Sequence, residues 1–503
     1  MSPELIDLHR PPKRRGRAFQ SAAPPPRLAT RLDVLDQAPP LIAALPAILN
    51  PCLEKSPATV MTRIILDWIL QGTPFDLLFQ RSAEGEYTRE FTLEHLVLVM
   101  LDVVCGFHPS TRSAFLDRQL QRIASLSAFY GKLNRLSPAI TAEVVRSTAM
   151  RSRNLIVGSG GLLPEPIAGY SARILDGNVL AGTDHRLLPT RDTWSACLPG
   201  KSLAIYEPAS GLILDLILEE NAHTQERDLL KKVPVAGNEL WILDRNLCVR
   251  TFLFRIARAD GFFLARRHQT TLPYEPAGPR KSRGRCPTGK VHEQPILVDD
   301  PEQPGTRHRL RLIILELDEP TREGETEIIL VTNLPEEVSA IDCCAAYHGR
   351  WGIEGHFQVL TDLLNCEIPT LGYPRAALLG FGMSAVAGNA LAVLKGCVRA
   401  EHGQEMAAEV SNHAVVTEVA RIYPGMMTAV PSRLWPALSD RPAQEVAELL
   451  NELAARMSVE WMLRVRRGPK KKKPQRSKGQ RYHHLATKKL LDQARGKRPP
   501  RTG

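Results

Sequence analysis

The segment Ala172-Arg-Ile-Leu-Asp-Gly-Asn178 marks the point at which the chain changes from helical to mixed α/β character. Its apolar residues run into Asp176-Gly177-Asn178, a pattern that predicts a strand ending in a turn. Upstream, residues 42–151 carry apolar side chains at helical spacing, which predicts a helical region. The chain therefore begins with helices and continues as a sheet.

Downstream of this segment the pattern predicts more strands and then helices. Residues 203–206 and 212–218 flank Pro208-Ala-Ser-Gly211 and predict a hairpin, 226–232 predict a short helix, and 240–243 predict a buried strand that stops at Asp244. Further strands are expected at 252–256, 261–266, 310–316 and 327–332, with a Pro/Gly/Arg-rich passage at 273–305. Helices are expected at 345–364, 376–394 and 443–464.

Length and charge suggest a protein of several domains with a basic tail. The chain has 503 residues, 43% of them hydrophobic, which allows roughly three domains. The stretch from Arg464 to Gly503 holds more positive charge than the whole chain's net +11, so the body is near neutral. A second basic cluster precedes the Pro24-Pro25-Pro26 run. Such clusters suit a polyanion such as DNA, although a solvated tail has the same composition.

Compartment is indicated by the cysteines and the apolar segments. The nine cysteines form no C-x-x-C pair and no zinc-ligand spacing, which is typical of a reduced intracellular protein. The first residues lack the apolar stretch of a secretory signal. Residues 376–394 carry no charge but are rich in Ala and Gly, so we expect a helix buried against a sheet. We expect no membrane association and a cytoplasmic, nucleoid-associated protein.

Three acidic residues are candidates for catalysis, and each also has an ordinary structural explanation. Asp176 and Asp244 each follow apolar strand residues, where turn or cap residues are common, although ligand sites favour strand ends. Glu354 lies on a helix, and Tyr347, Arg350 and position 361 fall on the same stripe at about 100° per residue. An acidic side chain can bind a metal ion, and neighbouring Arg and Tyr side chains can hold a phosphate, so this combination suits phosphoryl transfer. A solvated Arg–Glu pair at i,i+4 is the alternative.

These motifs resemble those of a known family. Tyr347-x2-Arg350-x3-Glu354 resembles the Y-x2-R-x3-E-x6-K signature of DDE-type transposases of the insertion sequence four family. The segment 174–177 resembles that family's first acidic motif, and Leu243-Asp244-Arg245 resembles its second. The resemblance covers about residues 170–400. One residue departs from it, because Thr361 stands where the signature has lysine, and this puts full activity in question.

The resemblance implies a fold and a set of domains. The fold is an α/β ribonuclease H-like mixed sheet flanked by helices, with a strand-rich insertion and an N-terminal helical region. The resemblance implies a catalytic domain at 166–463 with its insertion at about 250–340. Outside it, composition and periodicity predict a flexible basic arm at 1–40, a helical region at 41–165 that is a candidate for DNA binding, and a basic flexible tail at 464–503.

The resemblance also implies the chemistry. Asp176, Asp244 and Glu354 would be catalytic and would hold two Mg²⁺ or Mn²⁺ ions about 4 Å apart. Tyr347 and Arg350 would bind DNA phosphates. Arg245 would contact DNA or form a structural salt bridge. The insertion would hold a flipped base on an aromatic surface, for which Phe262, Phe263 and Tyr274 are candidates, although Phe262 and Phe263 suit a core equally well.

Three functions remain open at this stage. The first is a transposase that cleaves and joins double-stranded DNA at terminal inverted repeats and at target DNA, as a homodimer on paired ends. The second is a weakened or repurposed DNA-binding protein, suggested by Thr361. The third is a related metal-dependent nuclease.

Overall fold

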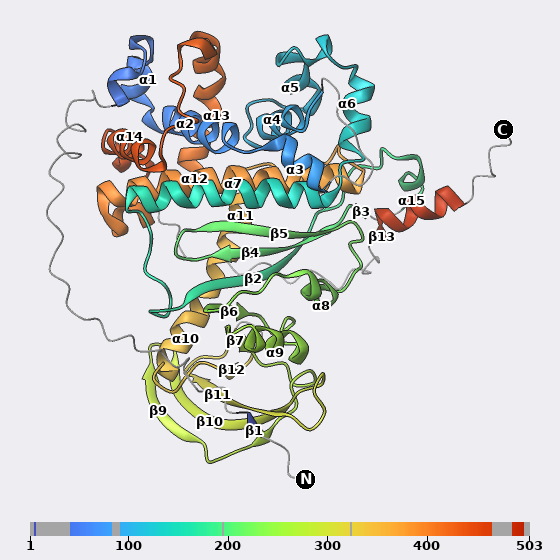
Figure 1. The fold of residues 1–503 in the computed structure, drawn as a ribbon, viewed down its shortest axis with the longest axis vertical. Helices are drawn as coiled ribbons and strands as arrows, with labels where there is room; N and C mark the ends of the chain where they lie inside the picture. Colours follow the sequence, from blue (N-terminus) through green and yellow to red (C-terminus); the bar gives the residue numbers. More distant parts are fainter. Residues whose placement is uncertain are drawn as a thin grey trace, which may run out of the picture.

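The computed structural model describes residues 5–6, 41–82, 91–193, 196–321, 324–464 and 485–496. Figure 1 shows a layer of helices at the top, a long sheet through the middle, and a strand-rich part at the bottom. Most of the basic arm and of the basic tail lies outside the described residues. The molecule is thus a large mixed α/β sheet with a helical region on one side.

The helical region predicted for residues 42–151 is confirmed. Its last helix, α7, begins with Pro138 at its first position and ends at Gly160, which adopts a left-handed φ of 74°. Proline at the first position and glycine just after the last residue are common at the two ends of a helix. The elements of this region are η2 (Leu41–Ala44), η3 (Ala47–Leu49), α1 (Asn50–Lys55), α2 (Pro57–Gln71), α3 (Phe75–Ser82), α4 (Leu93–Val104), α5 (Thr111–Asp117), η4 (Leu120–Arg122), α6 (Leu126–Leu133) and α7 (Pro138–Ser159).

The sheet is mixed and its strands follow the order β5-β4-β2-β6-β7-β12-β11-β10-β8. β4 and β5 pair antiparallel as the predicted hairpin, whereas β6 and β7 run parallel to β2. The strands of this first half, with their short helices, are β2 (Ser171–Val179), η5 (Leu188–Thr190), β3 (Cys197–Leu198), β4 (Lys201–Glu207), β5 (Leu212–Glu219), α8 (Glu226–Leu229), η6 (Leu230–Lys232), β6 (Glu239–Leu243), α9 (Arg250–Arg258) and β7 (Phe262–Arg266).

Two strand predictions in this half are wrong. Residues 252–256 form part of helix α9, because β6 and β7 are parallel and a parallel pair needs a crossover connection. Asp176-Gly177-Asn178 is no turn but lies inside β2, because β4 continues to pair with β2 as far as Val179. Only the β6 side of β2 ends at Leu175.

The predicted insertion extends the same sheet. β12 pairs antiparallel with β7, so the strands after residue 273 continue from the first half without a break. The Pro/Gly/Arg-rich passage at 273–305 contains three strands that its composition concealed. These three are β8 (Glu275–Pro276), β9 (Lys281–Cys286) and β10 (Gly289–Asp299). The other strands of this half are β11 (Arg307–Leu317), β12 (Glu327–Thr332) and β1 (Leu5–Ile6), which pairs with β11.

Helices follow the sheet, as predicted. The helix expected at 345–364 is interrupted by a 3₁₀ turn between Tyr347 and Glu354. Residues 485–496 of the basic tail form a short strand and a helix, and the strand pairs with β3. These elements are α10 (Ala340–His348), η7 (Gly349–Trp351), α11 (Gly352–Asp362), α12 (Pro374–Glu409), α13 (Asn412–Ala429), η8 (Ser432–Leu434), α14 (Ala443–Ala455), η9 (Val459–Met462), β13 (Leu485–Ala486) and α15 (Thr487–Gly496).

α12 is buried, as its small residues predict. Among the described residues it is the one helix long and apolar enough to cross a membrane, and 89% of its most apolar window is buried inside the protein. Its Asn389 has no exposed surface: the side-chain amide accepts a hydrogen bond from Ile213 N (2.9 Å) and donates one to Ile213 O (2.8 Å). Asn389 therefore satisfies the outer edge of β5, where a further strand would otherwise pair.

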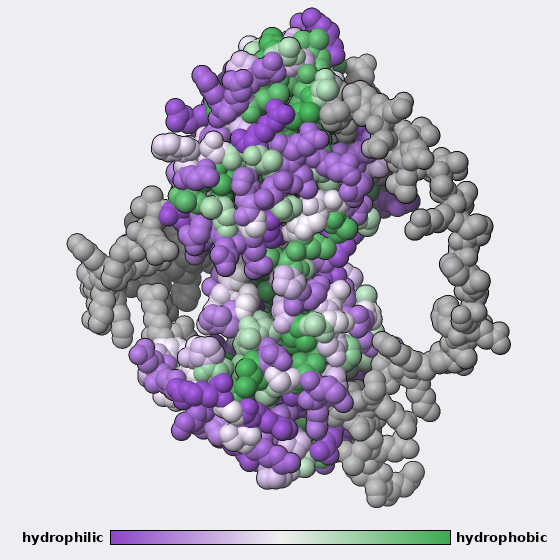
Figure 2. Space-filling view, turned by 90° about the vertical axis from the view of Figure 1, so that its left-hand side faces the viewer, coloured by the Kyte–Doolittle hydropathy of each residue, from purple (hydrophilic) through white to green (hydrophobic). Residues whose placement is uncertain are grey.

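The two faces of the sheet bury separate apolar clusters. Neighbouring residues of one strand point to opposite faces, so Ile174 joins the cluster under α7 and α12 while Leu175 joins the cluster under α9. Figure 1 shows α7 and α12 lying across the sheet on the same side. In Figure 2 hydrophobic surface gathers at the narrow middle of the molecule and just below it. Both faces are thus covered, as in other α/β proteins.

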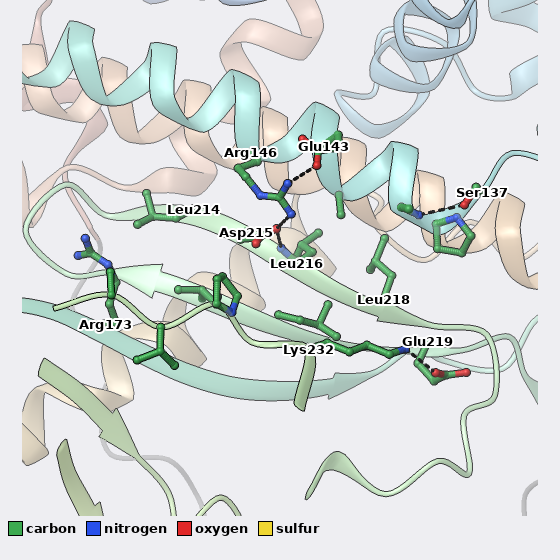
Figure 3. A pocket seen from close by; sticks show the side chains of 18 of the residues that line it. Ser137, Glu143, Arg146, Arg173, Leu214, Asp215, Leu216, Leu218, Glu219 and Lys232 are labelled. Carbon is green, nitrogen blue, oxygen red and sulfur yellow. Dashed lines mark hydrogen bonds and ion pairs between the residues drawn. The ribbon is translucent and has the colours of Figure 1, made fainter. Parts of the chain in front are cut away.

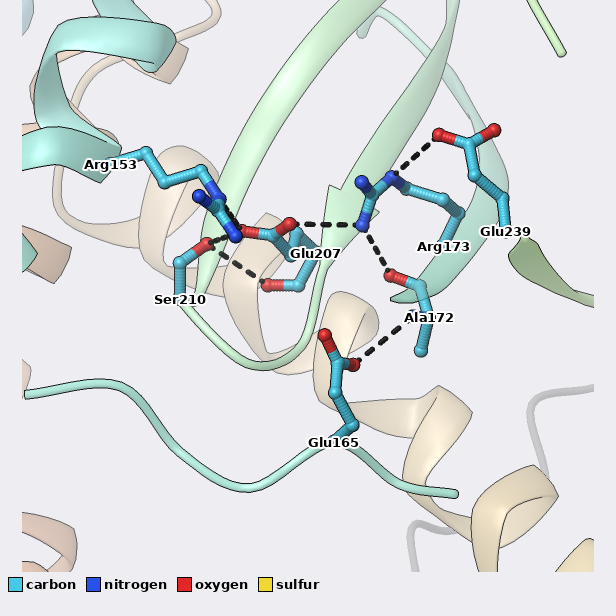
Figure 4. Close-up of polar contacts among 7 residues, drawn as sticks. All are labelled: Arg153, Glu165, Ala172, Arg173, Glu207, Ser210 and Glu239. Carbon is cyan, nitrogen blue, oxygen red and sulfur yellow. Dashed lines mark hydrogen bonds and ion pairs between the residues drawn. The ribbon is translucent and has the colours of Figure 1, made fainter. Parts of the chain in front are cut away.

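A network of buried charges ties α7 to three strands (Figure 4). Glu207, which is 1% exposed, accepts hydrogen bonds from Arg153 of α7 (2.9 Å) and from Arg173 of β2 (2.9 Å). Ser210 donates to the same carboxylate (2.6 Å), and Arg173 also pairs with Glu239 of β6 (3.3 Å). Because a buried carboxylate needs partners, this network fixes α7 against the sheet.

We expect Arg173→Met to lower the free energy of unfolding by about 3 kcal/mol or more, because it leaves the buried Glu207 carboxylate short of a cation. Urea denaturation measures this change. The control is Arg441→Met, since Arg441 pairs with Glu445 on the surface and its loss should cost less than about 1 kcal/mol. Equal effects of the two substitutions would contradict the structural role given to the Glu207 network.

Candidate functional site

Asp176 and Asp244 lie side by side where β6 ends. Leu175 of β2 stands opposite Leu243 of the parallel strand β6, so the next residue on each strand is an aspartate. Adjacent strands are about 4.8 Å apart, and although Asp244 lies one residue past the end of β6, its charge acts on the Asp176 carboxyl. The sequence placed both acids near strand ends, and the structure brings them together.

The electrostatics of this pair are strained. The pKa of the Asp176 carboxyl is raised to about 6: burial is the largest cause, Arg350 and the Gly177 amide oppose it, and Asp244 and Glu354 add to it. Asp244 accepts a hydrogen bond from the Leu247 amide (2.9 Å), which closes the turn after β6. Crowded carboxylates with a shifted pKa are typical of functional sites rather than of protein surfaces.

Arg350 joins the third acid to the first. Its Nη1 lies 3.4 Å from Asp176 Oδ2, and its Nη2 donates to Glu354 Oε1 at 2.9 Å. The Arg350 side chain is 10% exposed, whereas that of Glu354 is 50% exposed. Burial alone would lower the pKa of Arg350, but Tyr347 and both carboxylates more than offset it and raise that pKa. Arg350 therefore acts as the cation of the cluster.

Tyr347 supports Arg350. It is 7% exposed, and the guanidinium lies over its ring at 6.0 Å from the centroid. Burial raises the pKa of Tyr347, so its hydroxyl stays neutral. The predicted stripe of Tyr347, Arg350 and Glu354 thus does share one side, in spite of the 3₁₀ turn between them.

Arg245 and Thr361 are occupied by local contacts. Arg245 pairs with Glu325, which Arg266 of β7 also binds. The sequence left two roles open for Arg245, contact with DNA and a structural salt bridge, and this pair is such a salt bridge. The Arg245 side chain remains 43% exposed. The Thr361 hydroxyl donates to the Phe357 carbonyl of its own helix (3.0 Å). Thr361 is exposed and carries no charge to that end of α11.

Glu226 is an acid near the site that the sequence did not single out. A Cβ atom at Gly177 would lie 2.5 Å from Glu226 Oε1, so the bare glycine leaves room for this carboxylate. Burial raises the pKa of Glu226, Lys201 lowers it, and Asp244 raises it. Glu226 begins the four-residue helix α8, and nothing in its local sequence indicates this approach.

An exposed aromatic side chain follows Arg350 in the chain, but it is not one of the expected three. Phe263 is fully buried, Phe262 packs edge-on against Tyr170, and Arg267 covers Tyr274. Trp351, next to Arg350, is 47% exposed and lines a largely apolar cavity of about 720 Å³ with Tyr347, His348 and Cys344. Its position in the signature helix could have suggested it.

A larger cavity, of about 920 Å³, lies away from these acids between α7 and β5 (Figure 3). Its charges pair with one another: Arg146 binds Asp215 (3.1 Å) and Lys232 binds Glu219 (3.4 Å). None of Asp176, Asp244 and Glu354 lines it. Internal pairing leaves this cavity without a strong preference for a charged ligand, so the aspartate pair is the candidate site that we consider further.

The acids fit a divalent cation in chemical kind. Carboxylate oxygens are the hard ligands that Mg²⁺ and Mn²⁺ prefer. Among the residues that the structure describes, however, no group of three or more His, Cys, Asp or Glu side chains is close enough to hold a metal ion. The reason is Arg350, whose guanidinium stands between Asp176 and Glu354. Asp176 and Asp244 thus lie near each other, whereas Glu354 is bound by Arg350.

Comparison with known proteins identifies no family for this chain. No family model matches the chain, and no curated protein sequence is significantly similar to it. A solved structure that resembles it is the cryo-EM structure of the piggyBac transposase synaptic complex with hairpin DNA. That likeness has 12% sequence identity and a TM-score of 0.36, and it covers 80% of this chain and 86% of that one. Function is therefore inferred from the residues of this chain.

We expect Arg350→Met and Asp176→Asn to be coupled in a double-mutant cycle. Arg350→Met removes the cation from two carboxylates and should cost about 1–3 kcal/mol, and Asp176→Asn should recover part of that loss. Thermal and urea unfolding of the single and double variants give the coupling energy. Strictly additive effects would show that Arg350 does not hold Asp176.

Proposed function

We propose that this chain is a DNA transposase that cleaves and joins strands at the ends of an insertion sequence. The observation that carries the proposal is the paired Asp176 and Asp244 at adjacent parallel strands, with Glu354 linked to them through Arg350. The mixed sheet flanked by helices agrees with the fold that the motif resemblance implies. The proposal places the protein on double-stranded DNA in the cytoplasm.

Each residue of the cluster has a role in this proposal. Asp176, Asp244 and Glu354 would hold Mg²⁺ or Mn²⁺, and such ions activate the attacking oxygen and stabilise the leaving oxygen in phosphoryl transfer. Arg350 pairs with both Asp176 and Glu354 in the free protein, so its single positive charge offsets part of their negative charge. Its planar guanidinium also suits a phosphate, so a DNA strand entering the site can take Arg350 away from Glu354. Buried Tyr347 supports the guanidinium from one side.

DNA ends and a second copy of the chain are the proposed partners. Terminal inverted repeats and target DNA would be brought together by a homodimer. The exposed ring of Trp351, beside an apolar cavity, supports a stacking surface for a base turned out of the duplex. Trp351 replaces Phe262, Phe263 and Tyr274 in that role, since those rings are buried or covered.

The decisive experiment is cleavage of DNA that carries the sequences flanking the gene. Full-length protein with Mg²⁺ should produce nicks with a free 3′-hydroxyl. Asp244→Asn and Glu354→Gln should each reduce nicking by about 10³-fold or more, since loss of a metal position removes several kcal/mol of transition-state stabilisation.

The matched control is Asp228→Asn, which makes the same change at an exposed acid of α8. It should nick DNA like the unaltered protein. Undiminished nicking by Asp244→Asn would refute the assignment. Cleavage of unrelated DNA without strand-transfer products would favour a nuclease over a transposase.

Thr361 supports a second candidate, a DNA-binding protein with weakened catalysis. The position that carries lysine in the resembled signature is here an uncharged residue satisfied by its own helix. Such a protein would bind DNA ends in a salt-dependent way and would nick them slowly or not at all.

Thr361→Lys separates the two candidates. A new cation at this end of α11 should strengthen DNA binding and increase the salt slope, log Kobs against log salt, by about one unit. A weakened enzyme should also gain nicking activity, whereas a fully active one should not. Competition binding and nicking assays measure the two effects, and Thr361→Gln is the uncharged control of similar length.

A further inference from the structure

A second polar cavity, of about 290 Å³, lies on the opposite side of α11 from Glu354. Gly352, Gly355, His356 and Val359 line it at a helical spacing of three, four and seven residues. The rest of its wall comes from α12, from Tyr206 of β4 and the turn between β4 and β5, from the first residue of α13, and from Leu163 and Arg464. The carboxylate site and this cavity therefore share a helix but no lining residue.

The cavity is strongly positive. Lys395, Arg399 and Arg464 line it, and none of its described lining residues is an Asp or a Glu. Lys395 donates to the Val410 carbonyl (3.5 Å) and Arg399 donates to the Gly161 carbonyl, which are neutral acceptors. Three cations thus converge without a carboxylate among them, in contrast to the paired charges of the cavity in Figure 3.

The clustering of these cations is costly for the free protein. Burial, together with the charges of Arg464 and Arg399, lowers the pKa of Lys395 to about 8. Burial also lowers the pKa of the neighbouring His356 to about 4, so His356 is neutral and the positive charge comes from the other three side chains. An arrangement that disfavours its own charges is stabilised when an anion binds.

The start of α13 adds to the positive potential. Asn412, the first residue of this 18-residue helix, lines the cavity. The Ser411 side chain caps the Ala414 amide, and the remaining amides of the first turn have no partner within the helix. Helix N-termini carry partial positive charge and favour phosphates. The N-terminus of α13 and the three cations therefore contribute positive potential to the same cavity.

We propose that the cavity behind α11 is a binding site for a phosphoryl group. The guanidinium forks of Arg399 and Arg464 match phosphate oxygens, and Lys395 supplies a point charge between α12 and α13. About 290 Å³ is at the lower limit of ligand pockets, so the site admits one phosphate with little attached to it. The group is either a backbone phosphate of nucleic acid or a free phosphate. This site does not depend on DNA cleavage.

The experiment has two arms on the full-length protein. In the first, thermal unfolding is followed with increasing sodium phosphate against sodium chloride of equal ionic strength. The melting temperature should rise in a saturable way with phosphate only. In the second, binding of a duplex oligonucleotide is measured against salt concentration. A site for a backbone phosphate should contribute about one unit to the salt slope.

Lys395→Met and Arg464→Gln test the residues. Each should weaken phosphate binding by roughly tenfold or more, which is the loss expected for one charged hydrogen bond. Lys395→Met should fold at least as stably as the unaltered chain, because the lysine it removes is disfavoured by burial. Arg456→Gln, an exposed arginine at the end of α14, makes the same charge change outside the cavity and serves as the control.

The outcomes separate the two sources. A loss of phosphate stabilisation with an unchanged DNA salt slope identifies a free phosphate, and a reduced slope in Lys395→Met or Arg464→Gln identifies a nucleic-acid phosphate. The proposal is overturned if phosphate stabilises no more than chloride while the slope is unchanged, or if Arg456→Gln has the same effect as the cavity variants. Loss of nicking in Asp244→Asn bears on the carboxylate site alone.

Discussion

The parallel pairing of β2 with β6 is the constraint on which the site depends. It sets Leu175 opposite Leu243 and so delivers Asp176 and Asp244 to one edge of the sheet. Backbone hydrogen bonds fix this register, and the apolar residues before each aspartate hold it by packing on both faces. The two aspartates therefore need no interaction with each other to stay together. The packing of the buried residues around them and the positive charge of Arg350 offset the repulsion between the two carboxylates.

Arg350 connects the fold to the behaviour of the site. Asp176 and Glu354 share the guanidinium of Arg350, which is 10% exposed, so one internal positive charge offsets part of their negative charge in the free protein. The same side chain belongs to the helix that bears Glu354. Any ligand that attracts Arg350 will thus also free Glu354, and occupancy of the site by phosphate and by metal would be linked. The cations behind α11 belong to a different surface of this helix, so the two effects can be varied separately.

Sequence reasoning found the acids because their signals are local. A strand that stops at an aspartate and a helix with Tyr, Arg and Glu on one stripe are visible within ten residues. It failed where partners are distant: Asp176-Gly177-Asn178 looked like a turn, because the pairing with β4 that keeps it extended is not a local property. Phe252 to Ile256 looked like a strand until the parallel neighbours required a crossover helix. The Arg350–Asp176 contact spans 174 residues, and Glu226 reaches Gly177 from a separate element. Neither contact has a sequence pattern.

The amide of Asn389 has a consequence for how copies of the chain can associate. It imitates one residue of a neighbouring strand and saturates the outer edge of β5 at Ile213. An open edge of this kind would recruit the same strand from another molecule and lead to aggregates. Closing it with a side chain from a helix makes edge-to-edge growth of the sheet unfavourable there. Self-association would then have to use side-chain surfaces, which distinguish partners by shape and charge, rather than a backbone edge that accepts almost any strand.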